Sequence, residues 1–458
     1  MVFPQHIFKA YDIRGLVKED LSEDLAYRLG RAFVRLLKQE GTELTDRKIV
    51  IAKDMRPSSP LFAEQVIRGI NDEGVDVVDI GMSSSPVFNF ACADVSDFAG
   101  GIIVTASHNP AEYNGFKILR ESGLSVGKGT GMEELQEMVA SADMTEIAEK
   151  RGSLETQSLL ARYIEKIFSL VPKEDISPMH IVIDAGNGMA KTSFPVWLKE
   201  LPITVDYLYL EPDGTFPNHE ANPLKTETLK DLQAAVIEKG ADFGFALDGD
   251  ADRIGLVNEK GDVVPASFVG ALIGQEYLRD HGSMHMLYDL RSSSVLKDVY
   301  DSHNATSEMC MVGSTKIKKM MQDVNAGFAS ELSLHLFFKS MHYLESPDLC
   351  LLYILRLLSK EQKLLSELIT PLETYVHSGE MNFEVEDPAT VLSHVEDALK
   401  EEALEVSHLD GVWMKFEWGW VSLRKSNTEP LIRLNLETPN LEMTKEKVTM
   451  MKELINNA

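Results

Sequence analysis

Short runs of β-branched and other apolar residues alternate along the chain with longer segments in which apolar residues recur at helical spacing. The pattern predicts a helix over residues 61–71 and another, strongly apolar, around residues 349–359. Strands are predicted at residues 48–52, 75–80, 101–105, 180–184, 205–210, 243–247 and 286–289. Repeated alternation of strands and helices is typical of α/β units whose sheets are buried on both faces.

The last stretch of the chain has a different pattern. Residues 381–386, 411–417 and 420–423 read as antiparallel strands, and residues 444–456 read as a closing helix. We therefore expect an α/β fold class, with three α/β domains of mixed sheets followed by a smaller C-terminal α+β domain. The expected domains are 1–150, 151–255, 256–369 and 370–458.

The charge balance limits the partners that the chain can bind. It has 458 residues with 72 acidic and 45 basic side chains, which gives a formal net charge of −27. Nucleic acid and anionic membrane surfaces would be repelled by this field, so neither is an expected partner. An anionic substrate must therefore be held by a local group of cationic side chains.

Cysteine usage and the N-terminal segment indicate the compartment. Cys92, Cys310 and Cys350 are far apart and form neither a disulfide framework nor a zinc motif, which fits a reducing environment. Residues 1–14 lack the basic and apolar regions of a signal peptide. The longest apolar run, residues 349–355, is shorter than the roughly 20 residues that span a membrane. We expect a soluble, cytoplasmic protein.

A serine turn follows the predicted strand at residues 101–105. The segment Thr-Ala-Ser-His-Asn-Pro at residues 105–110 places Ser107 at a strand end, where its hydroxyl can act as a nucleophile, with His108 beside it. An ordinary Ser/Asn/Pro turn explains the same residues equally well.

An acidic loop follows the predicted strand at residues 243–247. Asp248, Asp250 and Asp252 alternate and can direct their oxygens at one hard cation. An EF-hand calcium loop is an alternative, because Glu259 falls at its position 12, but Arg253 stands where that loop requires glycine. A cation next to an arginine favours a clamp around a phosphoryl group.

Three further segments offer cations to a site. The run Arg-Lys-Ser-Asn-Thr-Glu-Pro at residues 424–430 has the side chains of a phosphate-binding loop, although a solvated polar turn is an alternative. Tyr11 and Arg14 lie in a probable turn near the start, and Lys117 lies in Tyr-Asn-Gly-Phe-Lys at residues 113–117. Each of these last two segments is a weak signal when taken alone.

Together and in this order, these motifs resemble those of the α-D-phosphohexomutase superfamily, and most closely the bacterial phosphomannomutase/phosphoglucomutases. The resemblance covers essentially the whole chain. It implies three related α/β domains and a C-terminal α+β domain around a central cleft. It also implies a phosphohexomutase that interconverts hexose 1-phosphate and hexose 6-phosphate, of mannose or glucose or both, through a phosphoserine and a 1,6-bisphosphate. Hexose phosphates would be its partners, and the chain would be a monomer or homodimer.

The resemblance also implies a role for particular residues, one loop in each domain. In the first two domains, Ser107 would carry the phosphoryl group and bind one Mg²⁺ with Asp248, Asp250 and Asp252. Arg14, Arg253, His108 and Lys117 would be catalytic, and glucose 1,6-bisphosphate would be the activator. Substrate binding would fall to Tyr11, Arg291, Glu331, Ser333, His335, Arg424, Ser426, Asn427 and Thr428.

The third domain departs from the family pattern. The sugar-binding loop of the family reads Gly-Glu-x-Ser-Gly-His, and here residues 330–335 replace both glycines, by Ser330 and Leu334. If those positions have positive φ, each replacement costs on the order of 1 kcal/mol. Arg291 stands where the family has lysine, and Ser294 and Ser314 replace a cation and a histidine.

These departures leave other functions open. Phosphoglucosamine mutase would use the same chemistry on another sugar. A sugar-phosphate phosphatase would result if the bisphosphate escaped and water attacked the phosphoserine. A catalytically weakened relative is a further alternative, although the retained Ser107, Lys117 and Arg253 disfavour a purely structural role.

Overall fold

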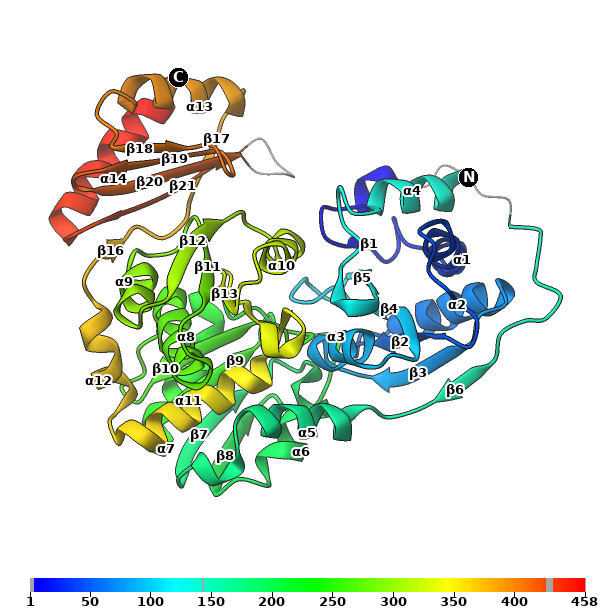
Figure 1. The fold of residues 1–458 in the computed structure, drawn as a ribbon. Coiled ribbons are helices and arrows are strands. Elements are labelled where there is room, and N and C mark those ends of the chain that lie inside the picture. Colours follow the sequence, from blue (N-terminus) through cyan, green and yellow to red (C-terminus); the bar gives the residue numbers. More distant parts are fainter. Residues whose placement is uncertain (1–3, 142–143, 426–430, 458) are drawn as a thin grey trace.

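The computed structural model describes residues 4–141, 144–425 and 431–457. Within these residues, four sheets follow one another along the chain (Figure 1). The first three contain both parallel and antiparallel strand pairs, and the fourth is antiparallel throughout. The predicted fold class is therefore confirmed: three α/β/α units with mixed sheets and a C-terminal unit with an antiparallel sheet.

The first unit has the strand order β1-β5-β4-β2-β3-β6. Alternate residues of its central strands face opposite layers: Ile49 and Ile51 share a core with α1, α2 and α4, whereas Val50 and Ala52 share one with α3. This alternation explains why residues 49–52, the middle of β2, are all apolar and buried. The elements are β1 (Ile13–Leu16), α1 (Glu23–Gln39), β2 (Lys48–Lys53), α2 (Ser59–Asp72), β3 (Val77–Met82), α3 (Ser85–Asp94), β4 (Phe98–Val104), β5 (Tyr113–Arg120), α4 (Met132–Ser141) and β6 (Leu154–Thr156).

The second unit is built on the order β10-β9-β7-β8. The buried run Phe-Gly-Phe-Ala-Leu forms β9, and the chain turns back through the acidic loop into β10, which pairs antiparallel with β9. This sheet therefore extends past residue 255, where the sequence pattern starts the third unit. The elements are α5 (Leu160–Leu170), β7 (Met179–Asp184), α6 (Phe194–Leu198), β8 (Ile203–Leu208), α7 (Lys230–Lys239), β9 (Phe243–Leu247) and β10 (Ile254–Asn258).

The third unit has the strand order β12-β11-β13-β14-β15. Its helix α11 is apolar on nearly all sides and is buried along most of its length, as expected for a helix inside a core. The Ser346 side chain caps α11 by accepting a hydrogen bond from Leu349 N. The elements are α8 (Ala266–His281), β11 (His285–Asp289), α9 (Val295–Ser302), β12 (Thr306–Cys310), α10 (Ser314–Asp323), β13 (Phe328–Ser330), β14 (Leu336–Phe338), β15 (Leu344–Glu345), α11 (Pro347–Glu361) and α12 (Leu365–Ile369).

The fourth unit is an antiparallel sheet with two helices, α13 and α14, packed on one face. Its other face meets the third unit through Trp413 and Trp420, which pack with Leu290. The elements are β16 (Val376–His377), β17 (Met381–Glu384), α13 (Pro388–Leu399), β18 (Glu405–Ser407), β19 (Val412–Phe416), β20 (Gly419–Lys425), β21 (Leu431–Thr438) and α14 (Leu441–Asn456).

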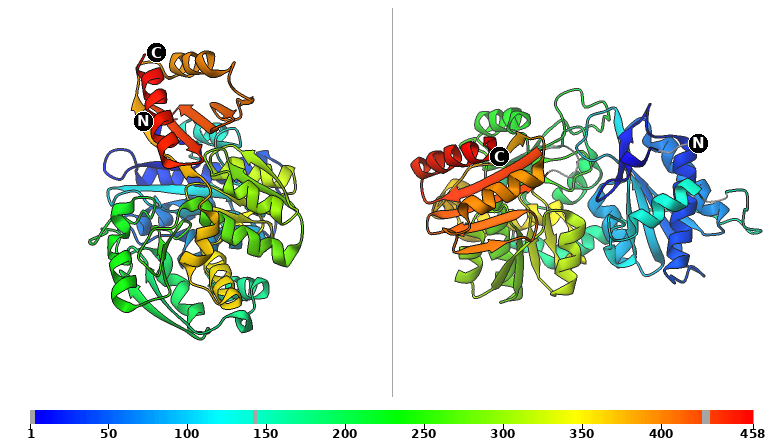
Figure 2. Two further views of the ribbon diagram at one scale, coloured as in Figure 1. Left: turned by 90° about the vertical axis from the view of Figure 1, so that its left-hand side faces the viewer. Right: turned by 90° about the horizontal axis from the view of Figure 1, so that it is seen from above.

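The four units are arranged around the loops that end their strands. The fourth unit stacks on the third, and the first lies beside the second and third (Figures 1 and 2). One continuous apolar core joins the second and third units and also includes Val87 and Phe90 of α3. The acidic loop after β9 and the serine loop after β4 are thus brought to the junction between the first and second units.

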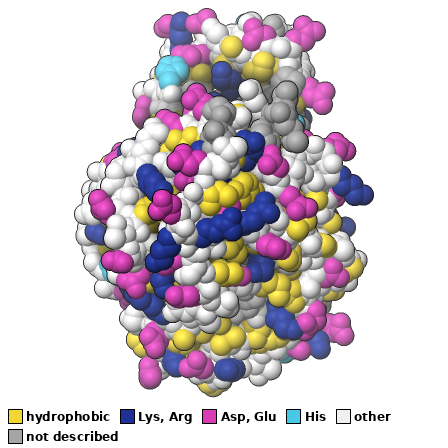
Figure 3. Space-filling model, turned by 90° about the vertical axis from the view of Figure 1, so that its right-hand side faces the viewer, with side chains coloured by type: hydrophobic (Ala, Val, Ile, Leu, Met, Phe, Trp, Pro, Cys, Tyr) yellow, Lys and Arg dark blue, Asp and Glu magenta, His cyan; other side chains and the backbone are white. Residues whose placement is uncertain are grey.

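The outer surface of the first unit carries acidic and basic side chains interspersed with apolar ones (Figure 3). Several cations of this unit are neutralised locally: Arg31 and Arg35 of α1 both lie 2.8 Å from Glu73 Oε1. Among the described residues, none of the helices has the length and apolarity needed to cross a membrane.

Candidate active site

Ser107 lies in a tight loop directly after β4. Its backbone has φ = 50°, a left-handed conformation that is costly for a residue with a Cβ. The loop is held by Ser107 N, which donates to Thr105 Oγ1 (2.9 Å), and by Asn109 N, which donates to Ala106 O (3.0 Å). The hydroxyl of Ser107 donates to Asp248 Oδ2 at 2.7 Å, so the serine faces the acidic loop of the second unit.

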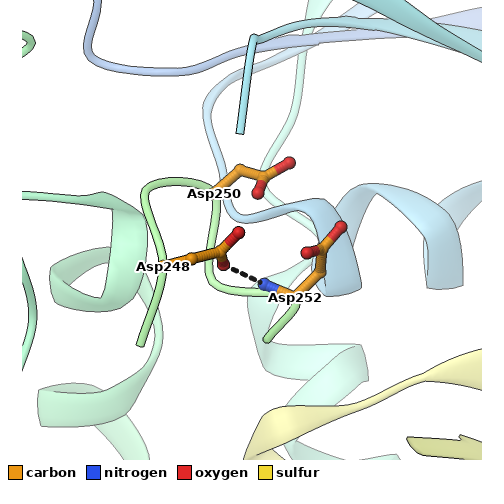
Figure 4. A group of neighbouring side chains, drawn as sticks. All are labelled: Asp248, Asp250 and Asp252. Atoms are coloured by element: carbon orange, nitrogen blue, oxygen red, sulfur yellow. Dashed lines mark hydrogen bonds between the residues drawn. The ribbon is translucent and has the colours of Figure 1, made fainter. Parts of the chain in front are cut away.

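The acidic loop between β9 and β10 gathers three buried carboxylates. Asp248, Asp250 and Asp252 each offer an oxygen atom, and these atoms all lie within 4.8 Å of one another. Asp252 N donates to Asp248 Oδ1 at 3.0 Å (Figure 4). Arg253 N donates to the same oxygen at 3.1 Å, and together the two bonds close the loop. Gly249 lets the acidic loop lie close to the serine loop, because a Cβ at residue 249 would lie 2.5 Å from Ser107 O.

The EF-hand alternative is wrong for two structural reasons. Strands, not helices, flank the loop. Glu259 instead hydrogen-bonds Ser366, at 3.1 Å to its N atom, away from the three aspartates.

Cationic side chains surround the carboxylates. Lys117 Nζ on β5 lies 2.6 Å from Asp250 Oδ2 and 2.5 Å from Asp252 Oδ2. Burial alone would lower the pKa of Lys117, but the two carboxylates outweigh it and raise that pKa above its ordinary value. Lys117 is therefore a fixed positive charge at neutral pH.

Arg14 and Arg253 are each held by contacts with other side chains. Arg14 pairs with Asp12 and donates to Asn109 Oδ1 at 2.5 Å, which links β1 to the serine loop. Arg253 Nε lies 3.3 Å from His335 Nε2 of the third unit. Burial disfavours the charge on Arg14, but Asp12 and the acidic loop raise its pKa, so the guanidinium stays charged.

The three aspartates repel one another. Burial and the charges of Asp252 and Asp250 raise the pKa of Asp248 to about 8. Burial acts in the same direction on Asp252, but Lys117 and His335 lower the pKa of that carboxyl well below its ordinary value. Carboxylates that are buried together in this way are relieved by a cation bound between them.

The donor set fits Mg²⁺. Carboxylate oxygens are the ligands that this hard cation prefers. Asp250 Oδ1 is buried and accepts no hydrogen bond from any described residue, so its lone pairs are available to a cation. Ser107 Oγ, at 2.7 Å from Asp248, adds a fourth oxygen at the same place.

His108 lies next to the serine hydroxyl. Its Nδ1 is 3.2 Å from Ser107 Oγ. Burial, together with the charges of Arg253 and Arg14, lowers the pKa of His108 well below 6.5. The ring is therefore neutral at physiological pH and can exchange a proton at Nδ1.

The loop after β13 carries the third group of predicted residues. His335 Nδ1 lies 3.1 Å from Glu331 Oε2 and 2.9 Å from Ser333 Oγ, and Ser333 Oγ donates to Glu331 Oε2 at 2.7 Å. Burial and Arg253 oppose the charged ring, but contacts with Asp252 and Glu331 raise the pKa of His335 to about 9. His335 Nε2 also lies 3.4 Å from Asp252 Oδ1, so this loop reaches the acidic loop.

The predicted effect of the replaced glycines differs between the two positions. Leu334 has φ = 64° and thus occupies the left-handed region, as expected for a glycine position. Ser330 lies within β13 and is absent from the positive-φ residues, so no strain arises there. The difference arises because Leu334 closes a turn, in which Leu334 N donates to Glu331 O at 2.9 Å.

Arg291 and Tyr11 border the third-unit loop. Arg291 is buried, pairs with Asp289 at 2.6 Å, and lies 3.6 Å from Glu331 Oε1 and 3.4 Å from Glu380 Oε2. The Tyr11 hydroxyl donates to Val312 O at 3.2 Å across the junction between the first and third units. Gly313 permits this contact, because a Cβ there would lie 2.2 Å from the hydroxyl.

Arg424 ends β20 and is held by Asp410, at 2.8 Å between Nη2 and Oδ2. The same carboxylate accepts a hydrogen bond from Val312 N at 3.3 Å, so the fourth unit is tied to the third beside Tyr11. The predicted phosphate-binding residues Ser426, Asn427 and Thr428 lie outside the described residues.

Several residues of the site were missed by sequence reasoning. Arg56 follows β2 and donates to Ser107 O of the serine loop, and Asp54 accepts from Arg56 Nε. Ser85 Oγ donates to Asp250 Oδ2 at 2.6 Å. A signal was present, because the segment after β2 comes at the same sheet edge as the segment after β4, with which β2 is parallel. Asp410 lies in a turn and gave no such signal.

Four family matches follow one another along most of the chain. The sequence matches phosphoglucomutase/phosphomannomutase, alpha/beta/alpha domain I, over residues 5–146, domain II over residues 161–261, domain III over residues 266–375, and the C-terminal domain over residues 380–454.

Curated relatives and solved structures agree with these matches. A phosphomannomutase of Methanocaldococcus jannaschii is 36% identical over 451 residues, covering 98% of this chain and 97% of the relative. A Xanthomonas campestris protein with the name "Phosphohexose mutases" is 33% identical over 432 residues, covering 94% of this chain and 94% of the relative. The crystal structure of a phosphoglucomutase/phosphomannomutase family protein from Burkholderia thailandensis has a TM-score of 0.89 at 29% identity, covering 99% of this chain and 98% of that one. The chain therefore belongs to the phosphoglucomutase/phosphomannomutase family.

Proposed function

We propose that the protein is a magnesium-dependent phosphohexomutase that interconverts hexose 1-phosphates and hexose 6-phosphates of mannose, glucose or both. One observation carries this proposal: the Ser107 hydroxyl lies 2.7 Å from Asp248 within a group of three buried carboxylates, and Lys117 pairs with the other two. Such a group holds a phosphoryl donor in line and stabilises its charge, which is most of what phosphoryl transfer requires. Relatives that cover nearly the whole chain are named phosphomannomutase.

Ser107 is the residue that carries the phosphoryl group. When bound by Asp248, Asp250 and Asp252, Mg²⁺ neutralises the carboxylates and the oxygens of the phosphoryl group. Arg14 and Arg253 stabilise the charge of the phosphoryl group in transit, and Lys117 adds a charge that does not titrate near neutral pH. His108, which is neutral, accepts the proton of the sugar hydroxyl or returns it to the serine oxygen.

The third and fourth units hold the sugar phosphate. Glu331, Ser333 and His335 bind the hydroxyls of the sugar, with Tyr11 and Arg291 at the border of this site. Arg424 and the loop of Ser426, Asn427 and Thr428 bind the phosphate that does not react. The sugar bisphosphate reorients within the site between the two half-reactions, so that its other phosphate faces Ser107. Glucose 1,6-bisphosphate activates the enzyme by phosphorylating Ser107. In this proposal each of the domains 1–150, 151–255, 256–369 and 370–458 supplies one loop.

Phosphorus NMR tests the proposal directly. Mannose 1-phosphate, glucose 1-phosphate and glucosamine 1-phosphate are supplied separately with Mg²⁺ and a trace of glucose 1,6-bisphosphate. We expect the 6-phosphate signal of mannose, glucose or both to appear, to be lost with Ser107→Ala, and to persist with the exposed control Ser96→Ala.

The other outcomes distinguish the alternatives. Turnover of glucosamine phosphate alone would identify a phosphoglucosamine mutase. Release of inorganic phosphate without isomerisation would identify a phosphatase. No turnover of any of the three sugars, or full activity of Ser107→Ala, would contradict the proposed mechanism.

A further inference from the structure

Arg56 is a buried arginine whose donors are all used by the serine loop, the start of β5 and one carboxylate. The residue is only 1% exposed. Nη1 donates to Pro110 O (2.7 Å) and Tyr113 O (2.9 Å), and Nε donates to Asp54 Oδ2 (3.2 Å). Nη2 donates to Ser107 O (3.0 Å) and Asn109 O (2.5 Å). A guanidinium has five N–H donors, and each of these contacts takes one of them.

These contacts collect four backbone carbonyls around a single planar group: three in the serine loop and that of Tyr113, the first residue of β5. The loop needs such support, because Ser107 is held at φ = 50°, where an L-residue is disfavoured. Without an internal donor, the same carbonyls would have to find water or turn outward. The guanidinium therefore stabilises the one loop conformation in which Ser107 Oγ faces Asp248.

Arg56 is itself fixed from two sides. Asp54 accepts from both the backbone N (3.0 Å) and Nε of Arg56, and Ser59 Oγ donates to Asp54 Oδ1 at 2.5 Å. On the other side, the Arg56 guanidinium carbon lies 5.1 Å from the centre of the Phe216 ring of the second unit, within cation–π distance. Gly214, two residues before Phe216, also packs against Arg56: a Cβ at residue 214 would lie 2.5 Å from Arg56 Cα. The residue thus joins the serine loop to the unit that carries the three aspartates.

We propose that Arg56 is a positioning residue for phosphoryl transfer, which holds the Ser107 loop in register with the acidic loop without touching substrate. The inference rests on the proposed function. A misplacement of the reacting oxygen by about 1 Å can cost on the order of 100-fold in rate. Lysine keeps the charge of Arg56 but has three donors and no planar fork, so Arg56→Lys removes the geometry and leaves the charge.

Arg31 offers a matched control within the same unit. It is also 1% exposed, donates to backbone carbonyls (Met144 O at 2.5 Å, and Glu146 O), and pairs with an acidic residue, Glu73, at 2.8 Å. It lies on α1, away from the serine loop. Arg31→Lys therefore imposes a similar structural loss without disturbing Ser107.

The experiment measures kcat and KM for the hexose 1-phosphate that the unsubstituted protein turns over, together with the thermal unfolding midpoint. For Arg56→Lys we expect kcat to fall about 100-fold, with KM changed by less than about threefold, because sugar-phosphate binding lies on other loops. Arg31→Lys should keep kcat within about threefold of the unsubstituted protein, even if its unfolding midpoint falls as far as that of Arg56→Lys. A loss of kcat in Arg56→Lys no larger than in Arg31→Lys would overturn the positioning role.

A second variant covers the case in which Arg56→Lys does not fold. Asp54→Asn keeps the arginine but weakens the contact that orients its Nε, and we expect kcat to fall about tenfold at unchanged KM. An unchanged kcat in Asp54→Asn would overturn the inference on its own. If the unsubstituted protein turns over no hexose phosphate, the proposed function fails first, and the positioning role fails with it.

Discussion

Leu334 provides a quantitative test of the site loop, through two substitutions compared with each other. The residue has φ = 64° and is buried, at 7% exposure, in the core shared by the second and third units. Leu334→Ala and Leu334→Gly both remove the buried side chain and leave nearly the same cavity. Each should destabilise the protein, since deleting a buried leucine side chain typically costs about 2–5 kcal/mol.

The difference between the two variants isolates the backbone. At an ordinary helix or strand position, glycine is less stable than alanine by roughly 0.5–1 kcal/mol, because glycine loses more freedom on folding. In the left-handed region a Cβ costs roughly 1–2 kcal/mol, and glycine escapes this cost. The second effect is larger, so Leu334→Gly should be more stable than Leu334→Ala by about 0.5–1 kcal/mol.

Thermal unfolding measures this difference. For a cooperative unit of 150–250 residues, 1 kcal/mol shifts the unfolding midpoint by about 2–4 °C. The midpoint of the glycine variant should therefore lie about 1–4 °C above that of the alanine variant, both below that of the unsubstituted protein. An alanine variant more stable than the glycine variant would refute the assignment of a left-handed backbone at residue 334, and with it the geometry of the loop that presents His335.

Two further predictions concern parts of the molecule outside the site. Lys318 and Glu345 are both buried and lie 2.8 Å apart, so Lys318→Met, which leaves the carboxylate unpaired, should cost about 3–5 kcal/mol. The double variant with Glu345→Leu should recover most of that loss in chemical unfolding, and no recovery would contradict the pairing. His219 lies 3.0 Å from Asp184; burial lowers its pKa, but this partner outweighs burial and raises it above 6.5. The stabilisation that the His219–Asp184 pair gives is thus complete below pH 6.5 and is lost as the pH rises through the raised pKa of His219. His219→Asn should therefore lower the unfolding midpoint more at pH 5.5 than at pH 9. The opposite trend would rule out a stabilising pair of charged His219 with Asp184.

The fold and the main loops could be predicted from sequence because they depend on local patterns. Buried strands such as β9 are continuous apolar runs, and the turn after each one is marked by glycine and small polar residues. Ser107 and Asp248 both follow such strands, so their positions at the ends of strands could be inferred without knowing how the sheets face each other. Their separation of 2.7 Å could not, because it joins residues 141 positions apart.

The residues that were missed have no distinctive local pattern. Arg56 reads in sequence as a charged residue in an exposed turn before a helix, since it stands between Met55 and Pro57. Only the tertiary structure shows that four carbonyls, more than fifty positions later in the chain, turn toward it. A buried arginine bound to backbone carbonyls and an exposed one look alike in a pattern of apolar and polar positions.

The prediction for the third-unit loop was partly right, for a geometric reason. Two glycines of the family pattern are replaced, and the sequence alone treats both replacements alike. The structure separates them, since Ser330 continues β13 while Leu334 closes the turn that follows. Sequence can show which residue stands at a position, but the sign of φ depends on the path of the chain on both sides of that position.

The net charge of −27 and the cationic site are reconciled by how the cations are held. Three of the arginines proposed to contact the substrate are already paired with a carboxylate: Arg14 with Asp12, Arg291 with Asp289 and Arg424 with Asp410. In the first two pairs, the partners are two positions apart on one segment, so the guanidinium is oriented before any ligand arrives and little side-chain entropy remains to be lost. Such a pair still has unused N–H donors, because a carboxylate engages only part of the five-donor fork. A phosphate can therefore bind to N–H donors that are already oriented, although the net negative charge of the protein would otherwise repel it.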